Sequence, residues 1–189
     1  MKKTVVIVDD EPITRMDLKE MLDDAGYDVI GEACDGFDAI EICKQQKPDL
    51  AIMDIKMPLL DGLKASKILI NENLAKCILL LTAYSDKDML KEAKEIGIMS
   101  YIVKPVDERT LLPAIEIAIA KQEQINAMKD EIDYMKKQLE DRKKIEKAKG
   151  VLMVQHEITE KEAYNMLRKL SMDKRCSMGK IADTINLSD

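Results

Sequence analysis

Four short apolar runs in the first half of the chain each end on residues whose side chains can bind a metal ion or a phosphoryl group. One run ends on two carboxylates, one on a single carboxylate, one on a hydroxyl and one on an amine. Carboxylates that converge without a cation repel one another and resist ionisation. A hard cation such as Mg²⁺ relieves that repulsion, because it prefers carboxylate and carbonyl oxygens and retains water molecules. The residues at the four ends are Asp9 with Asp10, Asp54, Thr82 and Lys104.

This set of side chains suits phosphoryl transfer, in which catalysis is mostly positioning and neutralisation of charge. Asp54 is the expected nucleophile, which accepts the phosphoryl group. Asp10, together with Asp9, is expected to hold Mg²⁺, while Lys104 and Thr82 bind phosphoryl oxygens. Strands also end in Asp, Thr or Lys by chance, but here all four ends carry a group that the chemistry requires.

The order of the apolar runs explains how these side chains are brought together. Five runs alternate with segments of helix length, and most of them are continuously apolar, which is typical of strands covered by helices on both faces. Alternation of this kind predicts an α/β fold with a doubly wound, five-stranded parallel sheet. Ligands bind at the carboxyl ends of the strands in such folds. The predicted strands are residues 4–8, 28–33, 50–53, 77–81 and 100–104, and two of the predicted helices are residues 13–25, with Met16, Leu18, Met21 and Leu22 on the apolar side, and residues 37–46, with Ile40 and Cys43.

The composition fits one domain of ordinary size with a smaller appendage. The chain has 189 residues, of which 46% are hydrophobic and 35% charged, so a core and a heavily charged surface are both possible. The four cysteines lack paired spacing, so we expect small buried side chains in a reducing compartment rather than disulfides or a zinc site. The first apolar run is too short for a signal peptide or a membrane span, so we expect a cytoplasmic protein with no membrane partner.

A long helix is predicted after the sheet. Pro113 is tolerated only near a helix start, so this helix is expected to begin near Thr110. No further glycine or proline occurs before Gly150, which allows about 35–40 helical residues against a mean of about 11–12. A helix lying on its own domain is the alternative, but we favour a coiled coil that pairs two chains. Its apolar residues, spaced three and four apart over about two heptads, are Ile125, Met128, Ile132, Met135 and Leu139.

The residues from about Arg142 onward predict three short helices. The first continues the long helix through Gly150, and because a glycine inside a helix costs about 1 kcal/mol relative to Ala, we expect a packing or contact reason for it. The second begins with a capping box made by Thr159 and Glu162, and the third is capped by Ser177. The expected inward residues are Ile145, Ala148, Leu152 and Met153, then Ala163, Leu167 and Leu170, then Ile181, Ala182 and Ile185.

Charge is divided unevenly along the chain, whose net charge is −6. Residues 1–135 hold 17 basic and 27 acidic side chains, and residues 136–189 hold 13 and 9, so the two parts carry −10 and +4. The acidic part repels nucleic acid, whereas the basic part attracts it. The alternative is that the positive charges only keep the helices solvated. In the basic part, Tyr164 is expected to pack in the core and His156 to be a solvated residue at a helix end.

The segments "IVDDEP", "MDIKMPLLDG", "LTAYS" and "YIVKP" make residues 3 to about 120 similar to the receiver domain of two-component response regulators. The resemblance implies a flavodoxin-like fold in which a sensor histidine kinase phosphorylates Asp54. It also implies that Mg²⁺ binds Asp10, Asp54 and the backbone carbonyl of Lys56, with Asp9 in the outer part of the pocket.

The same resemblance implies a cis peptide bond between Lys104 and Pro105. It also implies that Thr82 and Tyr101 are the switch pair that rearranges on phosphorylation. Lys56 and Tyr84 lie two residues past Asp54 and Thr82, where their side chains could flank the path of attacking water. We therefore hypothesise that these two residues set the lifetime of the phosphoryl group. Asp61 is expected to end the following turn rather than to bind the metal.

The segment "IEKAKGVLMVQHEITEKEAYNMLRKLSMDKRCSMGKIADTI" resembles the ANTAR domain, a three-helix RNA-binding antiterminator module, over about residues 140 to 187. Receiver, coiled coil and ANTAR in this order look like a response-regulator antiterminator, similar to those that serve ethanolamine-utilisation operons. The resemblance implies binding to paired hairpin loops in leader transcripts, whose splayed bases proteins read by stacking and hydrogen bonds. The cations expected to contact RNA are Lys143, Lys144, Lys147, Lys149, Arg168 and Lys169.

These observations predict a receiver domain at residues 1–120, a coiled-coil linker helix at 121–141 and an ANTAR RNA-binding domain at 142–189. Phosphorylation of Asp54 is expected to favour a homodimer, whose two basic modules bind RNA and prevent a terminator hairpin from forming. We expect no enzymatic activity beyond the receiver's own phosphoryl transfer and dephosphorylation.

Two other functions remain open at this point. The first is a DNA-binding regulator, although "GKIADTINLSD" would need a recognition helix after its turn to enter the major groove, and the chain stops at Asp189. The second is a phosphorylation-controlled module that binds another protein.

Overall fold

The computed structural model describes residues 2–83, 87–98 and 100–187, which form two compact units. The first unit covers residues 1–125 and the second covers residues 126–189. We describe each unit by itself. No described helix is long and apolar enough to cross a membrane.

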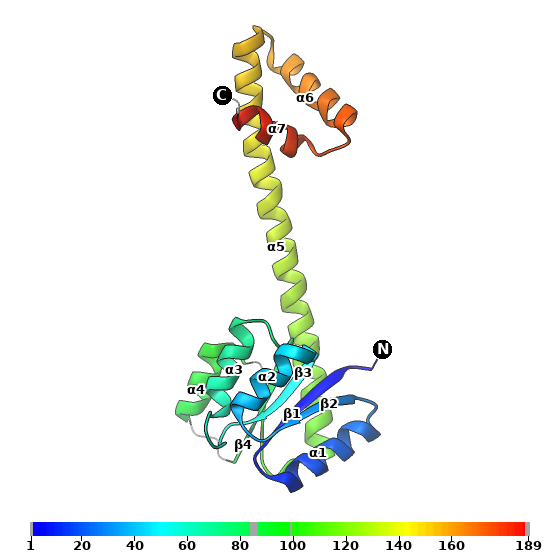
Figure 1. The fold of residues 1–189 in the computed structure, drawn as a ribbon, viewed down its shortest axis with the longest axis vertical. Helices are drawn as coiled ribbons and strands as arrows, with labels where there is room; N and C mark the ends of the chain where they lie inside the picture. Colours follow the sequence, from blue (N-terminus) through cyan, green and yellow to red (C-terminus); the bar gives the residue numbers. More distant parts are fainter. Residues whose placement is uncertain (1, 84–86, 99, 188–189) are drawn as a thin grey trace. The chain divides into compact units, whose positions relative to one another are not determined.

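The first unit is built on a parallel sheet with the strand order β2-β1-β3-β4-β5 (Figure 1). This order confirms the predicted doubly wound, five-stranded parallel sheet. The strand order reverses between β1 and β3, and ligands of such sheets bind at that point, outside the carboxyl ends of the strands. The strands are β1 (Thr4–Val8), β2 (Asp28–Ala33), β3 (Leu50–Asp54), β4 (Cys77–Thr82) and β5 (Ser100–Val103).

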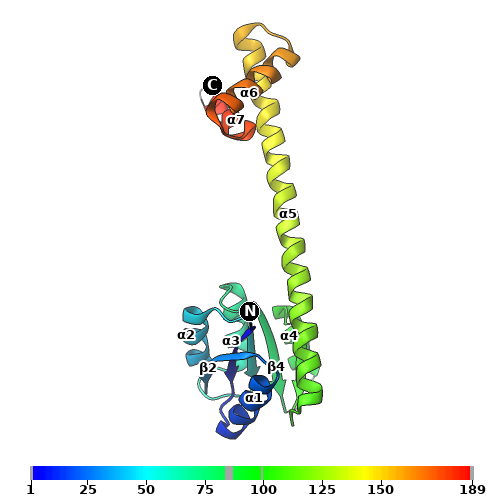
Figure 2. The same cartoon turned by 90° about the vertical axis from the view of Figure 1, so that its right-hand side faces the viewer.

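Helices cover both faces of the sheet, because alternate strand residues point into two separate cores. One core joins Val6, Val8 and Met53 to helices α2, α3 and α4, and the other joins Ile7 and Ile52 to α1 and the start of α5. Figure 2 shows α2 and α5 on opposite sides of the strands. The central strands are therefore buried on both faces, which explains why they read as continuous apolar runs. The helices are α1 (Pro12–Asp24), α2 (Gly36–Gln46), α3 (Gly62–Asn71), α4 (Lys87–Ile96) and α5 (Glu108–His156).

Two expectations about single side chains in this unit are wrong. Met16 is exposed, because α1 buries only the narrow stripe formed by Leu18 and Leu22. Cys34 is also exposed, whereas Cys43 and Cys77 are buried as expected. Burial raises the pKa of the Cys43 thiol to about 12 and that of Cys77 to about 11, so both stay as neutral thiols at neutral pH.

Helix α5 is 49 residues long, which exceeds the predicted length of about 35–40 residues. It begins at Glu108, close to the predicted start near Thr110, and the Asp107 carboxylate accepts a hydrogen bond from the Thr110 backbone N–H at 2.8 Å and caps the helix. It then continues without interruption through Gly150 to His156.

The second unit contains the end of α5, helix α6 (Glu160–Lys174) and helix α7 (Met178–Leu187) (Figure 1). The predicted capping box of Thr159 and Glu162 is confirmed, and the Ser177 hydroxyl accepts from the Lys180 N–H. The core uses small residues, so the helices approach closely. A Cβ on Gly179 would meet the Asp141 carboxylate of α5, which shows how near the two helices lie. The fully or nearly buried core residues are Ala148, Leu152, Ala163, Leu167 and Ala182.

Candidate functional sites

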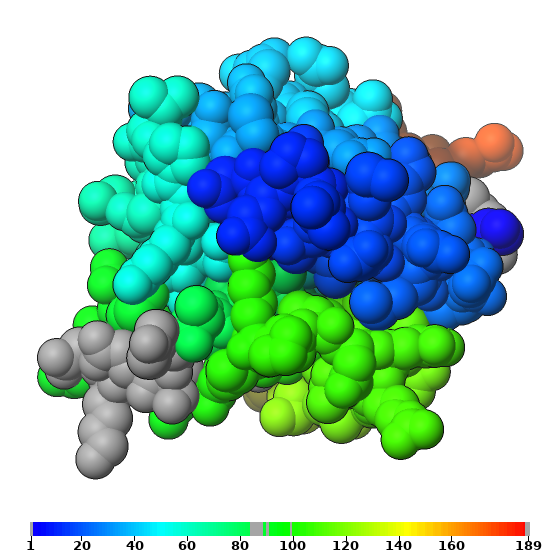
Figure 3. Space-filling view, turned by 90° about the horizontal axis from the view of Figure 1, so that it is seen from below, coloured from blue at the N-terminus to red at the C-terminus, as the bar shows by residue number. Residues whose placement is uncertain are grey.

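The predicted carboxylates meet at the carboxyl edge of the sheet in the first unit. Asp9, Asp10 and Asp54 each place a carboxylate oxygen within 4.8 Å of the others. The Lys104 ammonium lies 2.7 Å from Oδ2 of Asp9 and 3.2 Å from Oδ2 of Asp54. Figure 3 shows this end of the unit, where the blue residues at the start of α1 lie beside the green residues that lead into α5. Three carboxylates and one amine therefore share one site, as the strand ends predicted.

Asp9 lies deeper in this site than expected. It is fully buried, whereas Asp10 is exposed, so the expectation that Asp9 lies in the outer part of the pocket is wrong. The reason is that Asp9 extends the pairing of β1 with β2 through a hydrogen bond from its N–H to the Ala33 carbonyl. Its Oδ1 accepts from the Glu11 N–H at 2.9 Å, and its carbonyl accepts from the Arg15 guanidinium at 2.6 Å. Nothing in the sequence indicates this contact of Arg15.

The second oxygen of Asp9, Oδ2, is buried beside the Lys104 ammonium. Lys104 is close enough for an ion pair with Oδ2, but among the described residues no donor meets this buried atom at a hydrogen-bonding angle. A buried oxygen of this kind normally has a partner. Its free lone pair, together with the carboxylates of Asp10 and Asp54, matches the all-oxygen ligand set that Mg²⁺ prefers.

Asp54 is the final residue of β3 and is almost fully buried. Burial raises the pKa of its carboxyl group, because desolvation disfavours the charged form more than Lys104 favours it. Burial alone would lower the pKa of Lys104, but its contacts with Asp9 and Asp54 raise it, so Lys104 stays protonated. The Oδ1 atom of Asp54 accepts from the Ile55 N–H at 2.9 Å, which leaves Oδ2 toward the amine.

The loop after Asp54 is held close to it by glycine and by a helix cap. A Cβ on Gly62 would lie 1.9 Å from the Asp54 carbonyl oxygen, so only glycine fits there. The Asp61 carboxylate accepts from the Lys64 N–H at 2.9 Å and caps α3. This confirms that Asp61 has a structural role rather than a place in the acidic site.

The remaining predicted residues of the first unit lie around this edge or outside the described residues. Thr82 is the buried last residue of β4, and its carbonyl accepts from the Lys104 N–H at 2.8 Å. Tyr101 lies on β5 with its side chain half exposed, and the Lys104–Pro105 bond is cis as predicted. Lys56 follows β3 in the loop beside Asp54. Tyr84 lies outside the described residues, so its proposed role stays a hypothesis.

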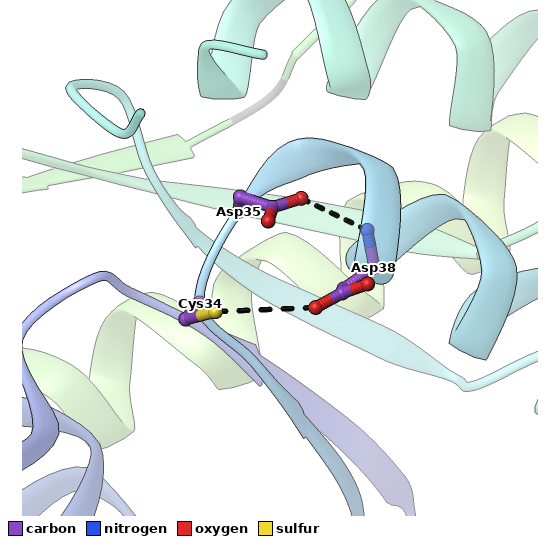
Figure 4. Close-up of side chains that lie close together, drawn as sticks. All are labelled: Cys34, Asp35 and Asp38. Atoms are coloured by element: carbon purple, nitrogen blue, oxygen red, sulfur yellow. Dashed lines mark hydrogen bonds between the residues drawn. The ribbon is translucent and has the colours of Figure 1, made fainter. Parts of the chain in front are cut away.

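Cys34, Asp35 and Asp38 form a second group of metal-ligand side chains at the end of β2 (Figure 4). Asp35 caps α2, because its Oδ1 accepts from the N–H groups of Phe37 at 2.8 Å and Asp38 at 3.0 Å. The Cys34 thiol lies 3.9 Å from Oδ2 of Asp38. Capping therefore accounts for the position of Asp35, and we assign no metal to this group.

In the second unit, the predicted RNA-contacting cations divide into two groups. Lys149 is only 7% exposed, and its ammonium lies 2.8 Å from Glu146 and 2.7 Å from Glu160. Lys144 pairs with Asp183 at 2.9 Å. The other predicted cations are exposed and form no ion pair with a described residue: they are Lys143, Lys147, Arg168 and Lys169.

For the second unit, one expectation is wrong, one is tested only in part and one is confirmed. Tyr164 is 44% exposed and does not join the core, whose inward positions on α6 are taken by Ala163 and Leu167. Gly150 is exposed, and a Cβ there would meet nothing within 4 Å, so packing against the described residues does not require this glycine, and the expected contact with a partner stays a prediction. His156 is an exposed residue at the end of α5, as expected.

The predicted coiled-coil stripe is an exposed apolar surface on α5. Ile125 is half-buried, and the other four side chains are each more than half exposed. Within the second unit, described residues therefore do not cover the part of the stripe that lies there. The four exposed residues are Met128, Ile132, Met135 and Leu139.

A doubly wound sheet with acidic residues and a lysine at its carboxyl edge defines a phosphoacceptor domain, and the comparisons with known proteins agree. The profile of the response regulator receiver domain matches residues 5–116, and that of the ANTAR domain matches residues 133–185. The chain therefore belongs to the response regulators that combine a receiver domain with an ANTAR domain. The ANTAR match begins before residue 142, inside the segment assigned to the coiled coil.

Known relatives match either nearly the whole chain or about two thirds of it. The transcriptional regulatory protein PdtaR of Mycobacterium tuberculosis is 40% identical over 183 residues, which covers 97% of this chain and 89% of that protein. The chemotaxis protein CheY of Thermotoga maritima is 38% identical over 115 residues, or 61% of this chain and 96% of that protein. The signal receiver domain of a modulated diguanylate cyclase from Desulfovibrio desulfuricans has a TM-score of 0.61 at 30% identity, covering 66% of this chain and 98% of that one.

Proposed function

We propose that this response regulator binds RNA hairpin loops in nascent transcripts and thereby prevents transcription termination, under the control of phosphorylation at Asp54. The observation that supports control most directly is the acidic site, where Asp54 faces Lys104 beside Asp9 and Asp10. The kinase that supplies the phosphoryl group is a sensor histidine kinase, and the protein acts in the cytoplasm. Its own phosphoryl transfer and dephosphorylation are its only catalytic steps.

Mg²⁺ fits the acidic site because the site offers three carboxylates, one of which has a buried oxygen without a hydrogen bond. Asp10 and Asp54 would hold the ion, with Asp9 and the Lys56 carbonyl beside them. When bound, Mg²⁺ neutralises negative charge on the carboxylates and the phosphoryl oxygens. A related solved structure, of the CheX–CheY complex of Borrelia burgdorferi with BeF₃ and Mg²⁺, aligns with a TM-score of 0.56 at 28% identity.

The chain's own residues then carry out the transfer. Asp54 Oδ2 attacks phosphorus and forms an O–P bond while the N–P bond to the phosphohistidine of the kinase breaks and the kinase histidine leaves. The Ile55 N–H holds Oδ1 of Asp54, and Asp9 holds the Lys104 ammonium. Lys104 stays protonated and pairs with the phosphoryl oxygens. Thr82 supplies a hydroxyl at the end of the adjacent strand β4, and its rearrangement with Tyr101 carries the change of state to the rest of the receiver.

The exposed stripe on α5 supports a homodimer. Apolar residues at three- and four-residue spacing are the seam of a two-stranded coiled coil, and such a seam is costly to leave in water. We propose that the phosphorylated receiver favours pairing along this seam, which presents two ANTAR units to two hairpin loops. The exposed cations Lys147, Arg168 and Lys169 support binding to the RNA backbone.

A competition experiment tests the nucleic-acid target. Phosphorylated protein is mixed with a labelled RNA carrying two hairpin loops, and unlabelled hairpin RNA or duplex DNA of equal length is added. We expect the RNA to displace the probe at much lower concentration than the DNA. Stronger displacement by the duplex would favour a DNA-binding regulator. If neither nucleic acid binds, the protein is a phosphorylation-controlled protein-interaction module.

A further inference from the structure

The one aromatic side chain of α6 lies at the surface of the second unit. Tyr164 is 44% exposed, although it directly follows the buried Ala163 and lies three residues before the buried Leu167. A half-exposed tyrosine ring offers a flat apolar face together with a polar tip. Single exposed apolar residues are common on protein surfaces. The exposure of Tyr164 alone therefore does not indicate a ligand.

The ion pairs of Lys149 show which side of α6 carries Tyr164. Glu160 reaches across from α6 to Lys149 on α5 at 2.7 Å. Tyr164 and Arg168 follow Glu160 at intervals of four residues, so the three side chains form one row along α6. The row begins at Glu160 beside Lys149 of α5, and both Tyr164 and Arg168 further along it are exposed.

The chemistry along this row changes from acidic to basic. Lys149 pairs with both Glu146 and Glu160, so it offsets part of the negative charge at this end of the row. Arg168 lies one turn beyond Tyr164, is exposed, and forms no ion pair with a described residue. A guanidinium beside an aromatic ring is the combination by which proteins bind unpaired bases, because the ring stacks on a base and the cation meets a phosphate or a base edge.

We propose that Tyr164 is the stacking platform for one unpaired base of the RNA hairpin loop, and that Arg168 binds the adjoining phosphate. The proposal rests on the RNA-binding function above and assigns that function to one face of α6. The exposed positive charge near the ring favours an anionic ligand with flat bases over an apolar protein segment. Lys149 has a different role here, because it holds α5 and α6 together instead of meeting RNA.

The experiment uses the full, phosphorylated protein and a hairpin RNA in which one loop base at a time is replaced by 2-aminopurine. Stacking on Tyr164 should quench the fluorescence of one loop position. Tyr164→Leu should abolish that quenching and weaken binding by about 5- to 150-fold, because base–aromatic stacking is worth roughly 1–3 kcal/mol. Tyr164→Phe keeps the ring and should bind as the wild type does.

Two further variants make the test specific. Tyr134 is a tyrosine on α5 with 63% exposure, so Tyr134→Leu is the matched control and should leave RNA affinity unchanged. Arg168→Gln should reduce the slope of log affinity against log salt by about 0.7, the value for one phosphate contact in a single strand. Thermal unfolding of each variant checks that its fold is intact, and a half-exposed position should tolerate leucine.

The outcomes separate this inference from the function on which it rests. Wild-type affinity and quenching in Tyr164→Leu would overturn the inference while leaving RNA binding in place. Retained RNA affinity with lost antitermination in Tyr164→Leu would also overturn it, because the ring would then meet a protein. If the wild-type protein itself binds no hairpin, the proposed function fails.

Discussion

At the scale of single residues, the acidic site holds charge that the fold does not favour. Burial raises the pKa of Asp54 in the folded state, which means that folding favours the protonated form of its carboxyl group over the charged form. The charged form therefore lowers the free energy of unfolding at neutral pH. Without a cation, the charged acidic site therefore makes the folded protein less stable.

Asp54→Asn should therefore raise the melting temperature of the protein at pH 7 in the absence of Mg²⁺. Each 1 kcal/mol relieved corresponds to roughly 2–4 °C for a chain of this size. The gain should shrink as the pH falls and Asp54 becomes protonated in the wild type, and it should also shrink when Mg²⁺ is added. Calorimetry across pH measures both effects, and Asp38→Asn, at an exposed carboxylate, is the control. An equal melting temperature for the wild type and Asp54→Asn would contradict this account.

The ion pairs of Lys149 predict how the stability of the second unit depends on pH. Its side chain is buried along the stem and its ammonium reaches two exposed carboxylates, Glu146 and Glu160. The hydrogen bond from Lys149 lowers the pKa of Glu160 below its ordinary value of 4.5. A lowered pKa in the folded state contributes stability above the unfolded pKa, and that contribution is lost as the pH falls through the folded value.

Glu160→Gln should therefore lower the melting temperature at pH 7, and the difference from the wild type should shrink as the pH falls below 4.5 and disappear below the folded pKa of Glu160. The effect should be small, because the glutamate is exposed. Glu131→Gln, elsewhere on α5 and exposed, should show no difference at either pH. A deficit for Glu160→Gln that persists unchanged in acid would show that the ion pair is not its cause.

At the scale of elements, the sequence predicted the sheet well because parallel strands are buried on both faces. Buried central strands read as apolar runs, and β2, which is only partly buried, was recognised from its β-branched residues and its place in the alternation. The bounds of β1 and β2 match the prediction, and β3 and β4 differ only by one residue at the carboxyl end. The terminal residue in both cases, Asp54 and Thr82, is a site residue. The chemistry of the strand ends could therefore be predicted together with the strands.

Side-chain burial was harder to predict where the core is small. Tyr164 was expected inside the second unit, but the inward positions on α6 are taken by the neighbouring Ala163 and by Leu167. No sequence pattern around Lys149, which lies between Ala148 and Gly150, indicates burial. It is buried because it lies on the side of α5 that faces α6. The depth of Asp9 depends on its backbone bond to Ala33, a contact between strands that one sequence does not reveal.

The exposed apolar stripe on α5 predicts where two chains associate. Ile132→Lys should weaken association of the phosphorylated protein by roughly 100-fold or more, because an unpaired charge would be buried in the seam at a cost of about 3 kcal/mol or more. Tyr134→Lys changes a more exposed residue two positions along the same helix and should leave association unchanged. Sedimentation at several concentrations measures both, and equal behaviour of the two variants would argue against pairing along this stripe.

At the scale of the whole molecule, the order of the domains connects a charge change to a nucleic-acid partner. The receiver match ends at residue 116 and the ANTAR match begins at residue 133, and α5 runs continuously through both boundaries. The first part of the chain is acidic and the last is basic, so the proposed function places contact with RNA at the end that follows the helix. Phosphorylation can favour the RNA-binding state only by stabilising it relative to the other state.

The most direct test of the central claim is the affinity of the protein for an RNA with two hairpin loops, measured by fluorescence anisotropy before and after phosphorylation with a small phosphodonor and Mg²⁺. The account predicts that phosphorylation raises the affinity of the wild type, and that Asp54→Asn binds as weakly as the unphosphorylated protein under both conditions. If Asp54→Asn bound the RNA as tightly as the phosphorylated wild type, phosphorylation of Asp54 would not be the switch.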